Sequence, residues 1–524
     1  MSYRQLRFAP FFILLAALSF ACDGDSPSPT PTATAEPADT PSPGPTATAP
    51  SVTATPSPTV VSLPPPDPIV WTGCDGWQCS QITVPLDYDD PGAGEITLAL
   101  TRLPASDPGA RIGPLFYNPG GPGAPASEYL RASAFAIPSE IKQRFDLVAF
   151  DPRGVGQSSP ILCGDNIQEI IALEPNPQTD EAWQTVLDSV QAFADLCAER
   201  AGEALSHYGT INVARDMDRI RQAMGEDQIT YLGFSYGTSI GQVYADLFPQ
   251  TVRAMLLDGA LDNALTAEQR NLEQMLGFDA TLNRFIEFCR DSGCFGVDPR
   301  EAIETLIQRT AETPIPAPSA DRPLNQGDLF AGITGNLYAR FQWSGLANAI
   351  GSALAGDGSA MIRLVDETWL RNPDGTYPNY FEAYYAVECL DHPYPRDPEE
   401  HRALKPVYAE QSILGPWWIN TSLPCAVWHG EPSPPDVPTA AGAPPILVIG
   451  NTGDPATPYK WAVALSRQLE SAVLLTYDAE GHTAYLQLNT CVDGIVNAYF
   501  LDLTVPDEGT ICGSAGIEPA PPVP

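Results

Sequence analysis

Short apolar stretches separated by turns are the main pattern in two parts of the chain. Five segments consist mainly of apolar, β-branched or aromatic residues, which predict buried strands: residues 114–117, 228–232, 255–257, 446–450 and 472–477. Residues 238–247 instead have the spacing of a helix, which Phe248 and Pro249 end. Buried strands that alternate with helices predict an α/β protein with a mostly parallel central sheet flanked by helices.

The region between these two parts has a different pattern. Residues 268–290 and 299–313 show helical spacing, and strand-like runs become rare. We therefore expect residues 263–424 to form a helical insertion. The α/β core would be made of residues 68–262 and 425–515, and residues 516–524 would be a disordered tail.

Ser235 lies in Gly233-Phe234-Ser235-Tyr236-Gly237, which matches the nucleophile elbow G-x-S-x-G. The expected strand precedes this motif and the expected helix follows it, which is the setting that an elbow requires. The glycines have a mechanical reason, because side chains there would collide with the neighbouring strand and helix. A glycine-flanked loop serine is the alternative, but it would need neither flanking element. Ser235 is therefore the predicted nucleophile.

A serine hydroxyl needs a general base at neutral pH, and the chain has five histidines. His482 lies in a loop directly after residues 472–477, so the end of a late strand would carry it. The remaining histidines lack such a setting and are expected to be surface or structural residues: His207, His392, His401 and His429. The orienting acid should lie between serine and histidine in the chain. Asp454, in the loop after residues 446–450, fits this order, and Asp258, directly after residues 255–257, is the rival.

Catalysis of acyl transfer also needs donors for the negative charge on the former carbonyl oxygen. Residues 114–117 lead into Asn118-Pro119-Gly120-Gly121-Pro122-Gly123. Glycines allow the backbone to approach a substrate oxygen closely. We expect the amides of Gly121 and of Tyr236, the residue after the nucleophile, to form an oxyanion hole. A loop of glycine and proline is also compatible with a plain turn.

Several segments together resemble the tripeptidyl-aminopeptidase-like branch of the α/β-hydrolases, which is related to the proline iminopeptidases. They lie within residues 70–515 and comprise residues 118–123, 151–158, 233–238, 257–259, 450–458 and 481–482. The resemblance implies an α/β-hydrolase fold, in which the helical insertion is a cap over the active site. It also implies a catalytic triad of Ser235, Asp454 and His482, and aminopeptidase activity.

The resemblance further implies how a substrate would be held. In aminopeptidases of this family, carboxylates in or beside the cap bind the free α-amine of the substrate. Glu388 and Asp391, within Ala386-Val387-Glu388-Cys389-Leu390-Asp391, are the expected amine-binding residues. An acidic residue is more often part of the solvated surface, so this alternative stays open.

The N-terminus has the pattern of a lipoprotein signal peptide over residues 1–22. Arg4 and Arg7 precede an apolar stretch that is too short for a confident membrane span, and Cys22 follows a candidate cleavage point. Residues 23–67 are rich in Pro, Thr and Ser and are expected to be a disordered spacer, because this composition buries no core. The chain would therefore be secreted or held at a bacterial cell surface by a lipid on Cys22.

The chain has eleven cysteines, so ten remain to pair if Cys22 carries lipid. Sequence alone leaves the connectivity open. Order along the chain, helped by the family resemblance, suggests these pairs: Cys74–Cys79, Cys163–Cys197, Cys289–Cys294, Cys389–Cys425 and Cys491–Cys512. Such pairing indicates an oxidising compartment.

Composition excludes several other functions. The formal net charge of −37 argues against binding to nucleic acid or to an anionic membrane surface, so the only expected membrane contact is the lipid anchor. The sequence contains no dinucleotide-binding fingerprint, P-loop or spaced metal-ligand cluster, and we expect no cofactor and no metal. The oligomeric state is not predicted.

The sequence therefore predicts an extracytoplasmic serine hydrolase. Its activity would be that of an aminopeptidase that releases single residues or short N-terminal peptides from substrates with a free N-terminus. A carboxylesterase with the same triad is the alternative, because nothing in the triad separates the two. A catalytically inactive lipoprotein that serves as a binding module is a third possibility, against which the complete triad argues.

Overall fold

The computed structural model describes residues 63–164, 167–513 and 516–518. The expected signal peptide, Cys22 and the spacer up to residue 62 lie outside the described residues. Residues 63–67, at the end of the expected spacer, contain no helix or strand. Among the described residues, no helix is both long and apolar enough to cross a membrane.

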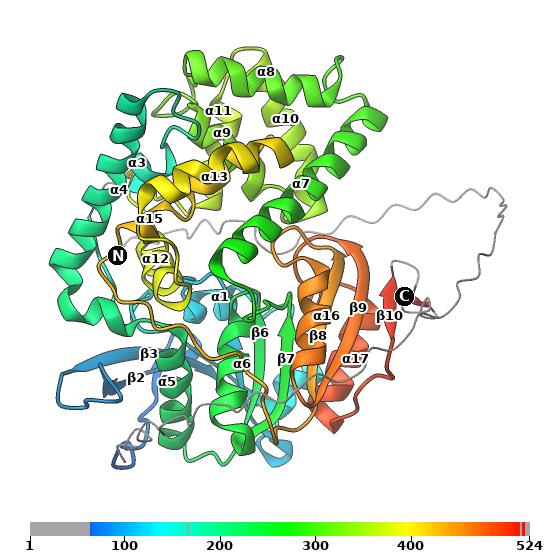
Figure 1. Ribbon diagram of the computed structural model, residues 1–524. Coiled ribbons are helices and arrows are strands. Elements are labelled where there is room, and N and C mark those ends of the chain that lie inside the picture. Colours follow the sequence, from blue (N-terminus) through cyan, green and yellow to red (C-terminus); the bar gives the residue numbers. More distant parts are fainter. Residues whose placement is uncertain (1–62, 165–166, 514–515, 519–524) are drawn as a thin grey trace, which may run out of the picture.

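A single twisted sheet forms the base of the molecule (Figure 1). Its spatial order is β1-β2-β3-β5-β4-β6-β7-β8-β9-β10-β11. The strands from β5 to β10 in this order are parallel, whereas the outer pairs at both edges are antiparallel. The strands are β1 (Thr72–Cys74), β2 (Trp77–Pro85), β3 (Glu95–Leu103), β4 (Gly113–Asn118), β5 (Phe145–Phe150), β6 (Ile229–Phe234), β7 (Val252–Asp258), β8 (Ile446–Gly453), β9 (Ala472–Glu480), β10 (Ile511–Gly513) and β11 (Gly516–Glu518).

Helices cover both faces of this sheet, which is why its central strands are apolar without alternation. On β8, Ile446 and Val448 pack into one core cluster while Leu447 and Ile449 pack into the other. The first cluster lies under α5 (Thr210–Ala223), α6 (Gly237–Leu247) and α16 (Tyr459–Gln468). The second lies under α1 (Ala126–Ser133), α2 (Ser139–Arg144) and α17 (Thr490–Asp502). The expected α/β-hydrolase architecture is confirmed.

A helical cap covers the edge of the sheet at which β4, β6, β7 and β8 end (Figure 1). Its longest helix, α7, begins at a capping box formed by Thr266 and Gln269. The cap helices after β7 are α7 (Ala267–Ser292), α8 (Pro299–Glu312), α9 (Gln326–Gly335), α10 (Trp343–Leu354), α11 (Ser359–Thr368), α12 (Tyr380–Asp391), α13 (Pro398–Gln411), α14 (Gly415–Asn420) and α15 (Leu423–Ala426).

Two further helices join the cap from a part of the chain that was expected to be core. α3 (Ile167–Ile171) and α4 (Asp180–Ala201) follow β5 but pack against α9, α12 and α15 rather than against the sheet. Trp183 of α4, for example, packs with Leu423 and Ala426 of α15. The boundary expected at residue 262 therefore misses part of the helical layer, because a helical pattern does not reveal which layer the helix joins.

The C-terminal edge also differs from the expectation. Residues 516–518 were assigned to a disordered tail, but they form β11, which pairs with β10 in antiparallel fashion. Disulfide bonds join the ten cysteines of the described residues in the pairs suggested by sequence order: Cys74–Cys79, Cys163–Cys197, Cys289–Cys294, Cys389–Cys425 and Cys491–Cys512. The last of these ties α17 to β10.

Candidate active site

Ser235 occupies the turn between β6 and α6 and has a φ of 54°. This left-handed conformation costs a non-glycine residue about 1–3 kcal/mol. The turn is held by the Ser235 amide, which donates to the carbonyl oxygen of Asp258 at 2.9 Å, and by the Tyr231 hydroxyl, which donates to the carbonyl oxygen of Gly237 at 2.8 Å. The strained turn that is typical of a nucleophile elbow is thus present.

The glycines of the elbow have no room for side chains. A Cβ on Gly233 would lie 2.6 Å from the carbonyl oxygen of Gly237. A Cβ on Gly237 would lie 2.8 Å from Oδ1 of Asn118, at the end of β4. The motif therefore brings the elbow into direct contact with the strand that carries the glycine-rich loop.

His482 and Asp454 form a hydrogen-bonded pair at the end of the neighbouring strands. Nδ1 of His482 lies 3.0 Å from Oδ1 and 2.9 Å from Oδ2 of Asp454. Burial tends to lower the pKa of His482, but the charge of Asp454 and its hydrogen bond outweigh burial and raise it. Nε2 of His482 makes no hydrogen bond to any described residue. This nitrogen is available to exchange a proton with a bound group.

Asp258, the rival acid, contacts the histidine loop instead of the histidine. Its carboxylate accepts hydrogen bonds from the amides of Ala484, at 3.0 Å, and Tyr485, at 2.8 Å. The side chain is completely buried, and burial raises its pKa to about 7. Asp258 therefore anchors the backbone that follows His482, and Asp454 is the acid that meets the imidazole.

The glycine-rich loop after β4 lies against the elbow. A Cβ on Gly120 would come within 2.8 Å of Cβ of Ser235 and 3.2 Å of the Tyr236 nitrogen. Gly121 has a φ of 115°, and it lines the same cavity as Ser235 and Tyr236. Tyr236 directly precedes α6, and the amides at a helix N-terminus lack partners within the helix. The predicted oxyanion donors thus lie beside the predicted nucleophile.

A cavity of about 460 Å³ separates the core from the cap. Ser235 and His482 line it from the core side, and α7, α9, α12 and α14 line it from the cap side. Aromatic side chains form a large part of the cap lining: Phe278, Tyr338, Phe341, Trp369, Tyr380, Phe381, Tyr384, Tyr385, Trp417 and Trp418. The volume is in the range of small-ligand sites.

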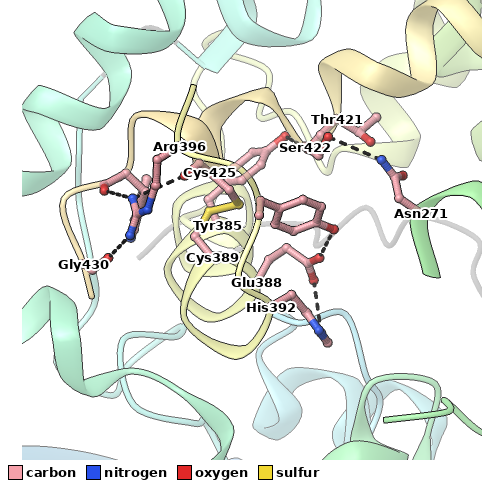
Figure 2. The surroundings of a disulfide bond; sticks show 12 residues. Asn271, Tyr385, Glu388, Cys389, His392, Arg396, Thr421, Ser422, Cys425 and Gly430 are labelled. Carbon is pink, nitrogen blue, oxygen red and sulfur yellow. Dashed lines mark hydrogen bonds and ion pairs between the residues drawn. A yellow bond between two sulfur atoms is a disulfide. The ribbon is translucent and has the colours of Figure 1, made fainter. Parts of the chain in front are cut away.

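Glu388 places a carboxylate in this cavity from α12. Its Oε1 receives a hydrogen bond from the Tyr394 hydroxyl at 2.7 Å and pairs with the guanidinium of Arg270. Its Oε2 lies 4.0 Å from Nε2 of His392 and makes no hydrogen bond to the described residues. Figure 2 shows Glu388 and His392 pointing toward one another, while Cys389 is joined to Cys425. One oxygen of Glu388 is therefore committed and the other is available to a ligand.

Asp391 is used within the protein. Its Oδ1 accepts from the Thr210 amide at 2.9 Å, and its Oδ2 accepts from the Thr210 hydroxyl. The same hydroxyl lies 2.6 Å from the hydroxyl of Tyr236. Asp391 thus connects α12 to the start of α5 and to the elbow. Of the two acids predicted to bind an amine, only Glu388 has a free oxygen.

Sequence reasoning missed three residues of this polar cluster. Arg270, Tyr394 and His392 surround Glu388, yet His392 was expected to be a surface or structural residue. Burial, followed by the charge of Arg270, holds the pKa of His392 well below its usual value, so this imidazole is neutral. The short spacing from Glu388 to His392, one helical turn, was the only local signal for the cluster. Among the described residues, no group of His, Cys, Asp and Glu side chains is arranged to hold a metal ion.

Comparison with known proteins agrees with this fold. Residues 113–292 match the family model described as alpha/beta hydrolase fold, and residues 410–512 match the model described as TAP-like protein. Serine protease Hip1 of Mycobacterium tuberculosis is 36% identical over 85% of this chain and 91% of its own length. Carboxylesterase B of the same species is 36% identical over 83% of this chain and 86% of its length. Tripeptidyl aminopeptidase of Streptomyces lividans is 32% identical over 81% of both chains.

The fold, the elbow and these similarities define a serine hydrolase. The chain belongs to the TAP-like family of α/β-hydrolases.

Proposed function

We propose that the protein is an extracytoplasmic aminopeptidase, which removes single residues or short peptides from substrates with a free N-terminus. The observation that carries this proposal is the free oxygen of Glu388 in the same cavity as Ser235 and His482. A carboxylate there attracts an α-ammonium group, and a charge-assisted hydrogen bond to it is worth about 1.5–3 kcal/mol. The cap closes the cavity over the elbow, which suits the end of a chain better than its middle.

The proposed reaction follows the geometry of the site. Nε2 of His482 takes the proton of Ser235 as the serine oxygen attacks the scissile carbonyl carbon. Asp454 holds the proton on Nδ1, so that Nε2 is the basic nitrogen. The amides of Gly121 and Tyr236 donate to the oxyanion of the tetrahedral intermediate. His482 then protonates the departing amine, the acyl-enzyme forms, and water hydrolyses it with the same histidine as base.

A carboxylesterase remains the second candidate. The observation in its favour is the 36% identity to a protein named Carboxylesterase B. Esters have a better leaving group than amides, so the same triad would cleave them, and the aromatic lining would accept an apolar acyl group. The two candidates differ in one expected property: kcat/KM of an aminopeptidase should depend on a free amine of the substrate, whereas kcat/KM of a carboxylesterase should not.

The place of action is also part of the proposal. Five disulfides support an oxidising compartment, and we propose that a lipid on Cys22 holds the enzyme at the cell surface. The only membrane contact would be this anchor, and the partners of the enzyme would be its peptide substrates.

A substrate panel tests the proposed activity. Aminoacyl, dipeptidyl and tripeptidyl coumarin amides, each with a free amine, would be compared with short acyl esters of the same fluorophore. We expect kcat/KM to be highest for one of the free-amine peptides. Ser235→Ala should lower kcat by about 10⁶-fold. Mass spectrometry after treatment with a fluorophosphonate should find the label on Ser235. Hydrolysis of the esters alone would support the carboxylesterase, and a label on another residue would contradict the assignment of the nucleophile.

A further inference from the structure

The cap segment of residues 338–342 packs against the histidine loop through its first two residues. The amide of His482 donates to the carbonyl oxygen of Tyr338 at 2.8 Å, and the two side-chain rings meet edge to face, with centroids 5.5 Å apart. This segment connects α9 to α10 and lines the cavity from Tyr338 to Gln342. It is therefore the part of the cap that lies against the proposed general acid.

The chemistry of acyl transfer gives this position a meaning. The histidine that protonates the leaving amine must be within hydrogen-bond reach of that amine. The part of a peptide after the scissile bond therefore begins with an amine nitrogen that lies beside Nε2 of His482. The cap segment that packs on His482 is then the surface beside which this departing part lies.

Arg340 and Phe341 give that surface a distinct character. Phe341 lines the cavity, and yet 56% of its surface is exposed. Arg340 is also exposed, and its guanidinium carbon lies 4.8 Å from the ring centroid of Trp343 and 5.4 Å from that of Phe288. Its guanidinium thus stacks on aromatic rings rather than on a carboxylate of the described residues. The two rings restrict the side chain while its charge stays available.

The surrounding charges make this cation stand out. Glu480 also lines the cavity, but its Oε2 is paired with Nε of Arg284 at 2.7 Å. Arg270 is paired with Glu388. The chain as a whole carries a formal net charge of −37, which on balance repels a carboxylate. Arg340 is a cation at an edge of the cavity that no carboxylate in the described part of the chain pairs with.

We propose that Arg340 and Phe341 bind the departing, C-terminal part of the peptide substrate, Phe341 by apolar contact and Arg340 by attraction for a carboxylate. The enzyme would then prefer peptides with an acidic residue, or a free C-terminal carboxylate, shortly after the cleaved bond. This inference rests on the proposed aminopeptidase function and adds to it a preference on the leaving-group side.

Matched peptides test the preference. Each pair would have the same free-amine N-terminal residues, chosen from the panel described above, and would carry either Asp or Asn at the first or second position after the cleaved bond. Product formation would be followed by liquid chromatography and mass spectrometry. We expect the wild-type enzyme to favour Asp by about threefold to fivefold in kcat/KM, the size of an exposed ion pair. The preference should shrink at 1 M salt, where the Debye length is about 3 Å.

Variants separate charge from apolar contact. Arg340→Gln should remove the preference for Asp, Arg340→Lys should keep it, and Arg363→Gln, at an exposed arginine of α11, should leave it unchanged. Phe341→Ser should lower kcat/KM for all extended peptides. Because Phe341 carries no charge, the ratio of kcat/KM between the Asp and Asn peptides should stay the same in this variant.

Two results would overturn the proposal in different ways. If the wild-type enzyme cleaves free-amine peptides but Arg340→Gln keeps the full preference for Asp, or no preference exists, this surface does not read the departing part. If the wild-type enzyme cleaves no peptide at all, the proposed aminopeptidase function fails, and the leaving-group site fails with it.

Discussion

Replacing Asp454 by asparagine should disable the base, because the surroundings of Asp454 dictate how the amide lies. Oδ1 of Asp454 accepts from the amides of Ala456 and Thr457, each at 2.8 Å. The oxygen of an asparagine must therefore stay on that side, and its NH₂ group takes the place of Oδ2, which lies 2.9 Å from Nδ1 of His482. Oδ1 also lies 3.0 Å from Nδ1, but it already accepts from the two backbone amides, so an N–H on Nδ1 would meet the NH₂ group at the shorter distance. The imidazole should move its proton to Nε2, where it can no longer accept one from Ser235.

The expected loss is large and specific to chemistry. The same exchange in a serine-protease triad lowers kcat by about 10⁴-fold, which corresponds to about 5.5 kcal/mol in the barrier. The assay is kcat with the best substrate of the panel, together with thermal unfolding of both proteins. Because the hydrogen bonds to Ala456 and Thr457 remain, the melting temperature of Asp454→Asn should stay close to that of the wild type.

Asp258→Asn is the matched control. Oδ2 of Asp258 alone accepts from both Ala484, at 3.0 Å, and Tyr485, at 2.8 Å, so a single amide oxygen can hold the histidine loop. We therefore expect this variant to retain activity within about tenfold of the wild type, which corresponds to a change of less than about 1.4 kcal/mol in the activation free energy. The assignment of the acid would be refuted if Asp454→Asn stayed within tenfold of the wild type, or if Asp258→Asn lost as much activity as Asp454→Asn is expected to lose.

Three further perturbations have defined outcomes. Gly237→Ala should lower kcat by about 10²-fold, because its Cβ would press on Asn118 and shift the elbow. Gly494→Ala in α17, where the space is open, should leave kcat unchanged. Equal kcat values for the two variants would contradict the close contact between Gly237 and Asn118. With a neutral ester as substrate, the rate should increase with pH through a midpoint above about 6.5, because the pKa of His482 is raised and only the neutral imidazole accepts the serine proton. A midpoint below about 6.5 would count against the pairing of His482 with Asp454. Cys22→Ala should release the protein from membranes or leave it unprocessed, and firm attachment of this variant in membrane fractions would contradict the proposed lipid anchor. Thiol titration of the denatured, unreduced ectodomain should find no free cysteine.

The fold could be predicted because its signals are local. The buried strands are continuous apolar runs, and the elbow needs glycines at fixed places, which the contacts of Gly233 and Gly237 explain. The order of Ser235, Asp454 and His482 along the chain follows from the order of the strands that carry them.

The surroundings of the site could not be predicted, because they depend on contacts between distant residues. Arg270 meets Glu388 across 118 positions of sequence, and Thr210 meets Asp391 across 181. No local pattern distinguishes an acid with a free oxygen from one whose oxygens are both used. In the same way, the helical spacing of α4 predicts a helix but does not show that its partner is α15.

The comparison of free and N-acetylated peptides tests the central claim most directly. If Glu388 binds the substrate α-ammonium, acetylation removes a charge-assisted hydrogen bond, and kcat/KM should fall by about tenfold to a hundredfold. Glu388→Gln should reduce this difference while Ser235 still accepts a fluorophosphonate label. An aminopeptidase is predicted to show this loss on acetylation. Equal cleavage of the free and acetylated peptides, or a preference for the free amine that survives in Glu388→Gln, would contradict the account.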